Sequence, residues 1–201
     1  MSDWIYLSSQ SPRRQALLTQ IGQKFELLLP DDGEDVEALE RIQAGETPRQ
    51  YVQRVTELKW AASVDRLQRR GLPRAPILCA DTTVALGREI FGKPKDRHHA
   101  HQILLALRGQ THEVLTAVCI GTSHELRQAL SISRVQFGPW PDAALERYLD
   151  LGEWAGKAGA YAIQGLAAAD IAHIEGSYSG IMGLPLYETA QLLRKPWRLE
   201  T

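Results

Sequence analysis

Apolar residues recur at three- and four-residue spacing over one long stretch of the chain, residues 47 to 71. Thr47 is placed as an N-cap, Pro48 stands at the first helical position, and Gly71 follows the last periodic residue. Because residues three and four apart share one face of a helix, this spacing predicts a single long helix that ends near Gly71. The periodic positions are Tyr51, Val52, Val55, Leu58, Ala62 and Val64.

Runs of apolar and β-branched residues predict strands elsewhere. Short runs at residues 4–8 and 25–29 predict two brief strands. The run ILCAD, residues 77–81, predicts a buried strand, and TTVAL then leads toward a hairpin that returns through EIFGKP. HEVLTAVCIG and RQALSISRVQF, residues 112–121 and 127–137, are separated by GTSHEL and predict an antiparallel pair.

Shorter helices are predicted between these strands, and the acidic stretch at residues 30–46 predicts a surface loop with one turn of helix. The mixture of hairpins and crossovers favours an α/β fold with a mixed sheet, and the length favours one domain covering residues 1–201. The predicted helices cover Pro12 to about Ile21 (closed by Gly22), a segment capped by Asp96 with Ile103, Leu104 and Leu107 on its inner face, residues 141–152 and residues 182–193.

Composition and charge exclude several classes of protein. The 201 residues are 44% hydrophobic and 23% charged, which is typical of a globular chain. The net charge of −1 argues against a polynucleotide partner, and neither a signal peptide nor a membrane-spanning run is predicted. Cys79 and Cys119 lie inside apolar runs and are expected to be buried, reduced cysteines. A cytoplasmic protein is the expectation.

The segment LSSQSPRR, residues 7–14, predicts a phosphate site. Ser11 is placed as an N-cap and Pro12 at the first helical position, so Arg13 and Arg14 fall in the first helical turn. Cations are unfavourable there because the N-terminus of a helix carries partial positive charge. An anion reverses that sign, since backbone N–H groups, serine hydroxyls and two guanidinium groups converge on it.

Two further segments offer charged side chains. Asp81 follows a hydrophobic strand and is expected at the rim of the sheet, where α/β proteins often bind ligands. A turn residue that accepts local N–H groups is an equally good interpretation of Asp81. Lys93 lies in FGKPKD, which ends a near match to a P-loop, but Pro94 replaces the required hydroxyl and excludes that motif. Lys93 is either a phosphate ligand or an ordinary turn lysine.

The segment WAGKAGAYAIQG, residues 154–165, is too rich in glycine and alanine for a regular core element. Small residues let the backbone approach a ligand closely, and the amide of Gln164 offers a donor and an acceptor for the edge of a base. The alternative is a close-packed connection around Lys157.

A divalent cation is expected to need two carboxylates together with water and phosphate oxygens. Glu34, in the acidic loop, is the candidate partner for Asp81. The histidines of residues 98–101 do not share one helical face and lack a partner at a familiar zinc spacing, so they favour a solvated surface.

Taken together, the motifs resemble the Maf family of nucleotide pyrophosphatases over nearly the whole chain. They are SQSPRR, the lysine of TELKWA, ADTTV, FGKPKD, RGQTHEV, KAGAYAIQG and EGSYSGIMGLPL, in the order in which that family has them. The resemblance implies a bilobed Maf/ITPase-like α/β fold, with a curved mixed sheet flanked by helices, a cleft between two lobes, and frequently a homodimer.

The same resemblance implies hydrolysis of a nucleoside triphosphate between its α and β phosphates, with Mg²⁺ or Mn²⁺. Asp81 matches the catalytic proton acceptor, and Glu34 matches an acidic position of the site that would share the metal with it. The residues that fall in motifs lining the phosphate end are Ser9, Ser11, Arg13, Arg14, Lys59 and Lys93.

Three positions resemble the subgroup that acts on dTTP and UTP, namely Arg13, Thr82 and Gln164. A neutral amide at Gln164 can pair with the oxygen and N–H pattern of uracil or thymine, and modified uridine triphosphates would fit the same pattern. One alternative is a nucleotide-sensing regulator of cell division that binds without needing turnover. Another is a nucleotidyltransferase, although no segment suggests an acceptor site.

Overall fold

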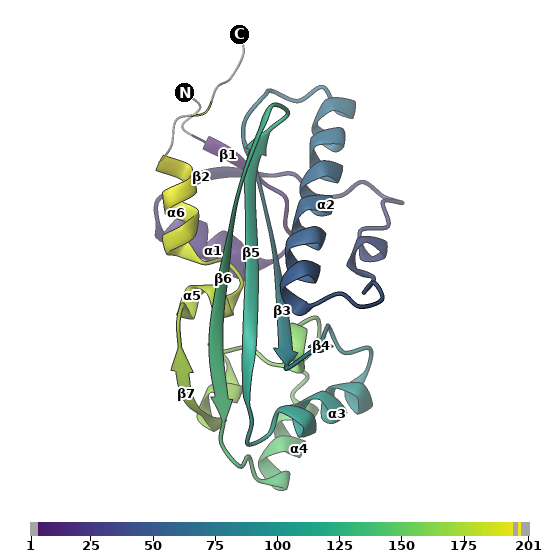
Figure 1. Cartoon of the computed structure of the whole chain (residues 1–201), viewed down its shortest axis with the longest axis vertical. Coiled ribbons are helices and arrows are strands. Elements are labelled where there is room, and N and C mark those ends of the chain that lie inside the picture. Colours follow the sequence, from purple (N-terminus) through teal and green to yellow (C-terminus); the bar gives the residue numbers. More distant parts are fainter. Residues whose placement is uncertain (1–3, 195–196, 198–201) are drawn as a thin grey trace.

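A computed structural model describes residues 4–194 and 197. In this part of the chain, seven strands form one mixed sheet in the order β2-β1-β3-β5-β6-β7, with β4 paired to β3 outside that path. Three strands, β3, β5 and β6, run along the long axis of the molecule and form its antiparallel centre, and β5 and β6 extend further than β3 (Figure 1). β1 is parallel to both β2 and β3. The predicted α/β class with a mixed sheet is confirmed.

The strands lie where the apolar runs placed them, apart from one that the sequence pattern missed. β7 is short and mostly exposed, with Ile174 38% exposed at the edge of the sheet, so it lacks the apolar run that marks a buried strand. The strands are β1 (Trp4–Leu7), β2 (Lys24–Leu27), β3 (Ile77–Leu86), β4 (Glu89–Phe91), β5 (Thr111–Thr122), β6 (Glu125–Phe137) and β7 (Ile171–Glu175).

The helices begin at the predicted caps. Thr47 accepts a hydrogen bond from Gln50 N in a capping box, and Asp96 accepts one from His99 N. The long central helix and the helix after Asp96 are therefore confirmed. The elements are α1 (Pro12–Gln20), the 3₁₀ helix η1 (Glu37–Glu40), α2 (Pro48–Arg69), α3 (Arg97–Leu107), α4 (Asp142–Asp150), the 3₁₀ helices η2 (Ala158–Ala160) and η3 (Leu166–Asp170), α5 (Tyr178–Met182) and α6 (Leu186–Arg194).

The single helix predicted for residues 182–193 is wrong at its start. Two helices replace it, because Gly183 adopts a φ of +121° and Pro185 cannot continue the hydrogen-bond ladder. The first of them, α5, is capped by Ser177, whose hydroxyl accepts from Gly180 N at 3.0 Å. This break turns the carbonyls of Met182 and Gly183 toward the start of α1.

Asp81 lies in the middle of β3 and not at the end of a strand, which corrects the prediction of a sheet-rim residue. The strand continues because Thr82, Thr83 and Val84 are β-branched and because β5 pairs with β3 from Ile77 to Ala85. A ligand can nevertheless approach Asp81 from the edge of β3 opposite β5.

That edge of β3 is open in its middle. β1 pairs with it at Ile77 and Leu78, and β4 pairs with it only from Val84 onward. Among the described residues, no strand pairs with positions 79–83 on that side. Because side chains alternate between faces, Asp81 shares with Cys79 the face covered by α2, whereas Thr82 shares with Ala80 the face covered by α1.

The core divides along the length of the sheet. The largest cluster packs α3 and α4 against the lower ends of the central strands and includes Leu104, Phe137 and Trp140 (Figure 1). Separate clusters join α1 and α6 to one face of the upper sheet and α2 to the other. Both cysteines, Cys79 and Cys119, are free and buried, as predicted. None of the described helices is both long and apolar enough to cross a membrane.

Candidate active site

A pocket of about 920 Å³ opens at the unpaired stretch of β3. Segments that are distant in the sequence line it: the loop from β1 into α1, the acidic loop, α2, β3, the turn after β4, the Gly-rich and Ala-rich segment, and α5. Every residue predicted for the site lies on its wall. These are Ser9, Ser11, Arg13, Arg14, Glu34, Lys59, Asp81, Thr82, Lys93 and Gln164.

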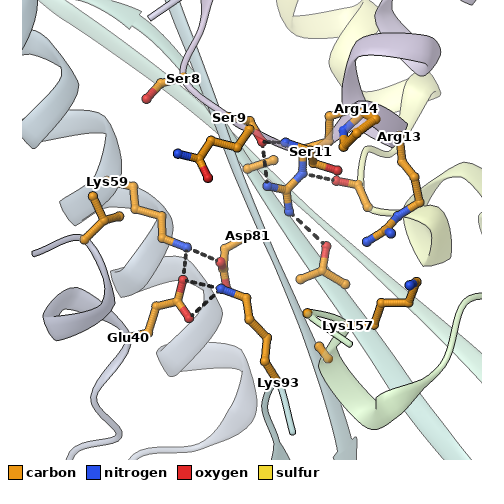
Figure 2. A pocket seen from close by; sticks show the side chains of 18 of the residues that line it. Ser8, Ser9, Ser11, Arg13, Arg14, Glu40, Lys59, Asp81, Lys93 and Lys157 are labelled. Carbon is orange, nitrogen blue, oxygen red and sulfur yellow. Dashed lines mark hydrogen bonds and ion pairs between the residues drawn. The ribbon is translucent and has the colours of Figure 1, made fainter. Parts of the chain in front are cut away.

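On the α2 side of the pocket, four charged groups form a continuous chain, which we call the lysine network: Asp81, Lys59, Glu40 and Lys93 (Figure 2). Lys59 Nζ donates to Asp81 Oδ1 at 2.5 Å and to Glu40 Oε1 at 2.6 Å. Lys93 Nζ donates to both carboxylate oxygens of Glu40, at 3.2 Å each. Asp81 itself is 8% exposed at the floor. The network alternates in sign: Lys59 joins Asp81 to Glu40, and both lysines meet at Glu40.

Electrostatic coupling keeps this network charged. Burial alone would lower the pKa of Lys59, but the carboxylates of Asp81 and Glu40 outweigh it and raise that pKa above its ordinary value. For Glu40, burial acts to raise the pKa, and the two lysines outweigh it and lower it. Lys59 and Glu40 are therefore both ionised at neutral pH.

On the opposite side of β3, two arginines of the first turn of α1 face the pocket. Arg14 donates from Nε to the carbonyl of Gly183 at 2.8 Å, and its terminal nitrogens approach Ser9 Oγ at 3.3 Å and Thr82 Oγ1 at 3.4 Å. Arg13 donates from Nε to the carbonyl of Met182 at 3.2 Å. Within residues 4–194, neither guanidinium group forms an ion pair with a carboxylate, and burial lowers the pKa of both. Two partly buried cations without a carboxylate partner favour an anionic ligand.

The start of α1 is also open. Ser11 is the N-cap residue, as predicted, but its side chain makes no capping hydrogen bond. The hydroxyl of Ser9 instead accepts from Ser11 N at 3.2 Å, which fixes the turn into the helix. Ser11 thus lines the pocket beside two arginines, where an anion would benefit from the positive end of the helix.

The Gly-rich and Ala-rich segment forms the third wall. Gly159 has a φ of +69°, and a Cβ there would lie 2.7 Å from a methyl group of Val84, so the segment packs directly on β3. Tyr161 anchors it, because its hydroxyl bonds His112 Nε2 at 2.8 Å, and burial lowers the pKa of His112 to about 4, so the ring is neutral. Gln164 follows, exposed and on the pocket wall. The close-packed connection is therefore confirmed, and the pairing of the Gln164 amide with a base stays a prediction.

Glu34 lies on the pocket wall but in a different set of contacts, which we call the arginine network: Arg66, Arg69, Glu34 and Asp31. Arg66 donates from Nε to both oxygens of Glu34 at 3.1 Å, and Arg69 Nη2 donates to Glu34 Oε1 at 2.6 Å. Arg66 lowers the pKa of this carboxyl. In the described part of the chain, Glu34 thus pairs with guanidinium groups and forms no hydrogen bond with Asp81.

The residue that sequence reasoning missed is Glu40. It is one of several acidic residues in a polar loop, and its only distinguishing signal is the turn of helix predicted there. That turn is η1, which stands over Lys59 and presents the carboxylate to both lysines.

Comparison with known proteins then decides the family. The Maf-like protein model matches residues 4–196. The chain belongs to the Maf family. A protein of Cupriavidus pinatubonensis named dTTP/UTP pyrophosphatase is 60% identical to it over 97% of this chain and 98% of its own length. A protein of the same name from Albidiferax ferrireducens is 58% identical over 96% of this chain and 97% of its own. Among solved structures, the Staphylococcus aureus Ham1 protein matches with a TM-score of 0.43 and 10% identity, over 67% of this chain and 72% of that one.

Proposed function

We propose that this Maf-family protein is a pyrophosphatase that hydrolyses dTTP and UTP to the monophosphate and pyrophosphate. The observation that carries the proposal is the pairing of a buried carboxylate, Asp81, with Lys59 in a pocket whose other wall holds two arginines free of carboxylates. The names of relatives 58–60% identical over nearly the full chain support the choice of substrates.

In this reaction the oxygen of water forms a bond to phosphorus while the bridging P–O bond between the α and β phosphates breaks. Asp81 accepts the proton of the attacking water, and pyrophosphate leaves. Lys59, Lys93, Arg13 and Arg14 neutralise charge on the phosphate oxygens, which is the main means of accelerating phosphoryl transfer. The serines at the start of α1 donate hydrogen bonds to the same oxygens.

We assign selection of the nucleotide base to the three positions predicted from the sequence, Arg13, Thr82 and Gln164. Gln164 lies on the pocket wall formed by the Gly-rich and Ala-rich segment, where its amide can pair with a uracil or thymine edge. Thr82 Oγ1 lies 3.0 Å from Thr116 Oγ1 and accepts from Arg14 Nη2 at 3.4 Å, so this position is next to an arginine proposed to bind the phosphates. Modified uridine triphosphates that keep the same edge are expected to be substrates as well.

A divalent cation fits this pocket only together with the substrate. Among the described residues, no group of three or more His, Cys, Asp and Glu side chains could hold a metal by itself. Asp81 and Glu40, however, both lie within 2.6 Å of one lysine nitrogen, and Mg²⁺ commonly takes one or two carboxylates plus phosphate oxygens. We therefore assign Mg²⁺ or Mn²⁺ to Asp81 with Glu40, and keep Glu34 as the sequence-based alternative. A bound cation would neutralise phosphate charge and acidify water.

The test is product analysis with dTTP, UTP, CTP, GTP and 7-methyl-GTP in Mg²⁺ or Mn²⁺. Monophosphate and pyrophosphate should form from dTTP and UTP, and Asp81→Asn should abolish them. Binding of the nucleotides without turnover would overturn the enzyme assignment and favour the regulatory alternative. Transfer of the nucleotide to an added acceptor, with little monophosphate formed when the acceptor is left out, would favour a transferase.

The remaining expectations concern the setting of the enzyme. A free nucleotide substrate agrees with a cytoplasmic location and with the near-neutral net charge of −1, which gives no general attraction to nucleic acid. The homodimer implied by the family resemblance is checked by analytical ultracentrifugation.

A further inference from the structure

Three consecutive backbone carbonyls around Glu40 are held by two side chains of α2. Tyr51 Oη donates to the carbonyl of Glu40 at 2.9 Å. Arg54 Nη2 donates to the carbonyl of Arg41 at 2.9 Å, and Nη1 approaches the carbonyl of Leu39 at 3.4 Å. The end of η1 is therefore fixed to the same helix that carries Lys59.

The guanidinium of Arg54 is itself fixed on both sides. Glu46 accepts from Arg54 Nε at 2.6 Å and from Nη2 at 2.8 Å, and the Glu46 side chain is only 7% exposed. The guanidinium carbon also lies 5.7 Å from the ring centroid of Tyr51. A bidentate pair and an aromatic contact define one orientation of the fork. We call Arg54, Glu46 and Tyr51 the clamp.

None of the clamp residues lines the pocket. What the clamp fixes does line it, because Glu40 contacts both Lys59 and Lys93. A carboxylate on a free loop would follow the lysines, whereas a carboxylate on a fixed turn determines where they point. Resting on the proposed function, we propose that Arg54 is a positioning residue that holds Glu40 in place and thereby aims Lys59 and Lys93 at the substrate phosphates.

Arg54→Lys keeps the charge but cannot reproduce the fork, so the two carbonyls and Glu46 lose their common partner. Because a displacement of about 1 Å at a catalytic group can cost up to about a hundredfold, kcat should fall about tenfold, with a smaller change in KM. Tyr51→Phe removes one hydroxyl and should lower kcat in the same direction by less. Arg97→Lys is the matched control, since Arg97 also binds a carboxylate, that of Asp150, through Nε and Nη2 but lies on α3 and does not line the pocket.

The decisive measurement is a double-mutant cycle with Glu40→Gln. If Arg54 acts through Glu40, Arg54→Lys should change kcat little once Glu40 is replaced, whereas independent effects multiply. Thermal unfolding of each variant separates loss of fold from loss of positioning. Multiplicative effects, an unchanged kcat in Arg54→Lys, or a fall in KM in Glu40→Gln with kcat kept would overturn the inference. Absence of dTTP and UTP hydrolysis by the unaltered protein would instead overturn the proposed function.

Discussion

The two charged networks on the pocket wall are built from similar acids but from different bases. In the arginine network, Arg66 is 1% exposed and also donates to the carbonyl of Leu28 at 3.1 Å and to Ser8 Oγ at 3.2 Å. In the lysine network, the partners of Lys59 Nζ within residues 4–194 are the carboxylates of Asp81 and Glu40, and the network ends at Lys93 on the surface. A guanidinium with several fixed partners ties a loop to the core, whereas an ammonium among carboxylates can exchange one anion for another. The first network is suited to stability and the second to binding phosphate.

The largest effect expected from this difference is on turnover in Asp81→Asn. Loss of a general base lowers kcat by about 10²- to 10⁴-fold. Stability should change by no more than about 1 kcal/mol, because Lys59 keeps Glu40 as its partner and no buried cation is left unpaired. Steady-state kinetics with UTP and thermal unfolding of the same preparation check both halves. A variant that loses most of its stability would show that the lysine network is structural too.

Glu34→Gln should have the opposite effect to Asp81→Asn, with a large loss of stability and little change in kcat. It leaves the buried guanidinium of Arg66 without its carboxylate, and breaking such a pair costs about 3 kcal/mol of unfolding free energy. The value of kcat in folded protein should stay within about threefold, since such a residue has no transition-state contact to lose. Denaturant unfolding and kinetics with dTTP measure the two quantities.

Glu146→Gln supplies the control for that experiment, because Glu146 pairs with Arg97 while about half exposed, and such pairs contribute little. A large loss of kcat in Glu34→Gln at unchanged stability would contradict the contrast between the networks. It would restore Glu34 as the metal-binding partner of Asp81 predicted from the sequence.

The same contrast shows how far sequence reasoning reaches. Local signals were sufficient for the caps at Thr47 and Asp96 and for the antiparallel pair, because these depend on nearby residues. The prediction that Asp81 lies at the rim of the sheet was wrong. The surroundings of Asp81 depend on where β1 and β4 stop pairing with β3, and distant segments set those points. Strand β7 was not predicted, because an exposed edge strand carries no apolar run.

The site was predictable as a set of residues but not as a set of contacts. The sequence motifs predicted that Arg13, Lys59 and Lys93 belong to one site, and all three line the pocket. The partners of each carboxylate are decided by folding, so Glu34 and Glu40, six positions apart in one acidic loop, were not distinguishable. Only the structure shows that one meets two arginines and the other two lysines.

The smallest expected effect is on acid stability. Hydrogen bonding to Arg66 lowers the pKa of Glu34 below its ordinary value of 4.5. Its stabilisation is therefore complete above pH 4.5 and is lost as the pH falls through the lower pKa of the folded state. The difference in unfolding free energy between the unaltered protein and Glu34→Gln should be constant at neutral pH and should narrow below pH 4.5.

The difference in unfolding free energy between the unaltered protein and Glu40→Gln should also narrow as the pH falls, but it should be smaller than the difference for Glu34→Gln. The pKa of Glu40 is also lowered, but burial acts to raise it and offsets part of what the lysines contribute. His112, whose pKa of about 4 lies in the same range, is present in every variant and cancels from each difference. Urea unfolding from pH 7 to pH 3 measures both differences. A larger acid-sensitive difference for Glu40 than for Glu34 would mean that the lysine network, and not the arginine network, stabilises this side of the pocket.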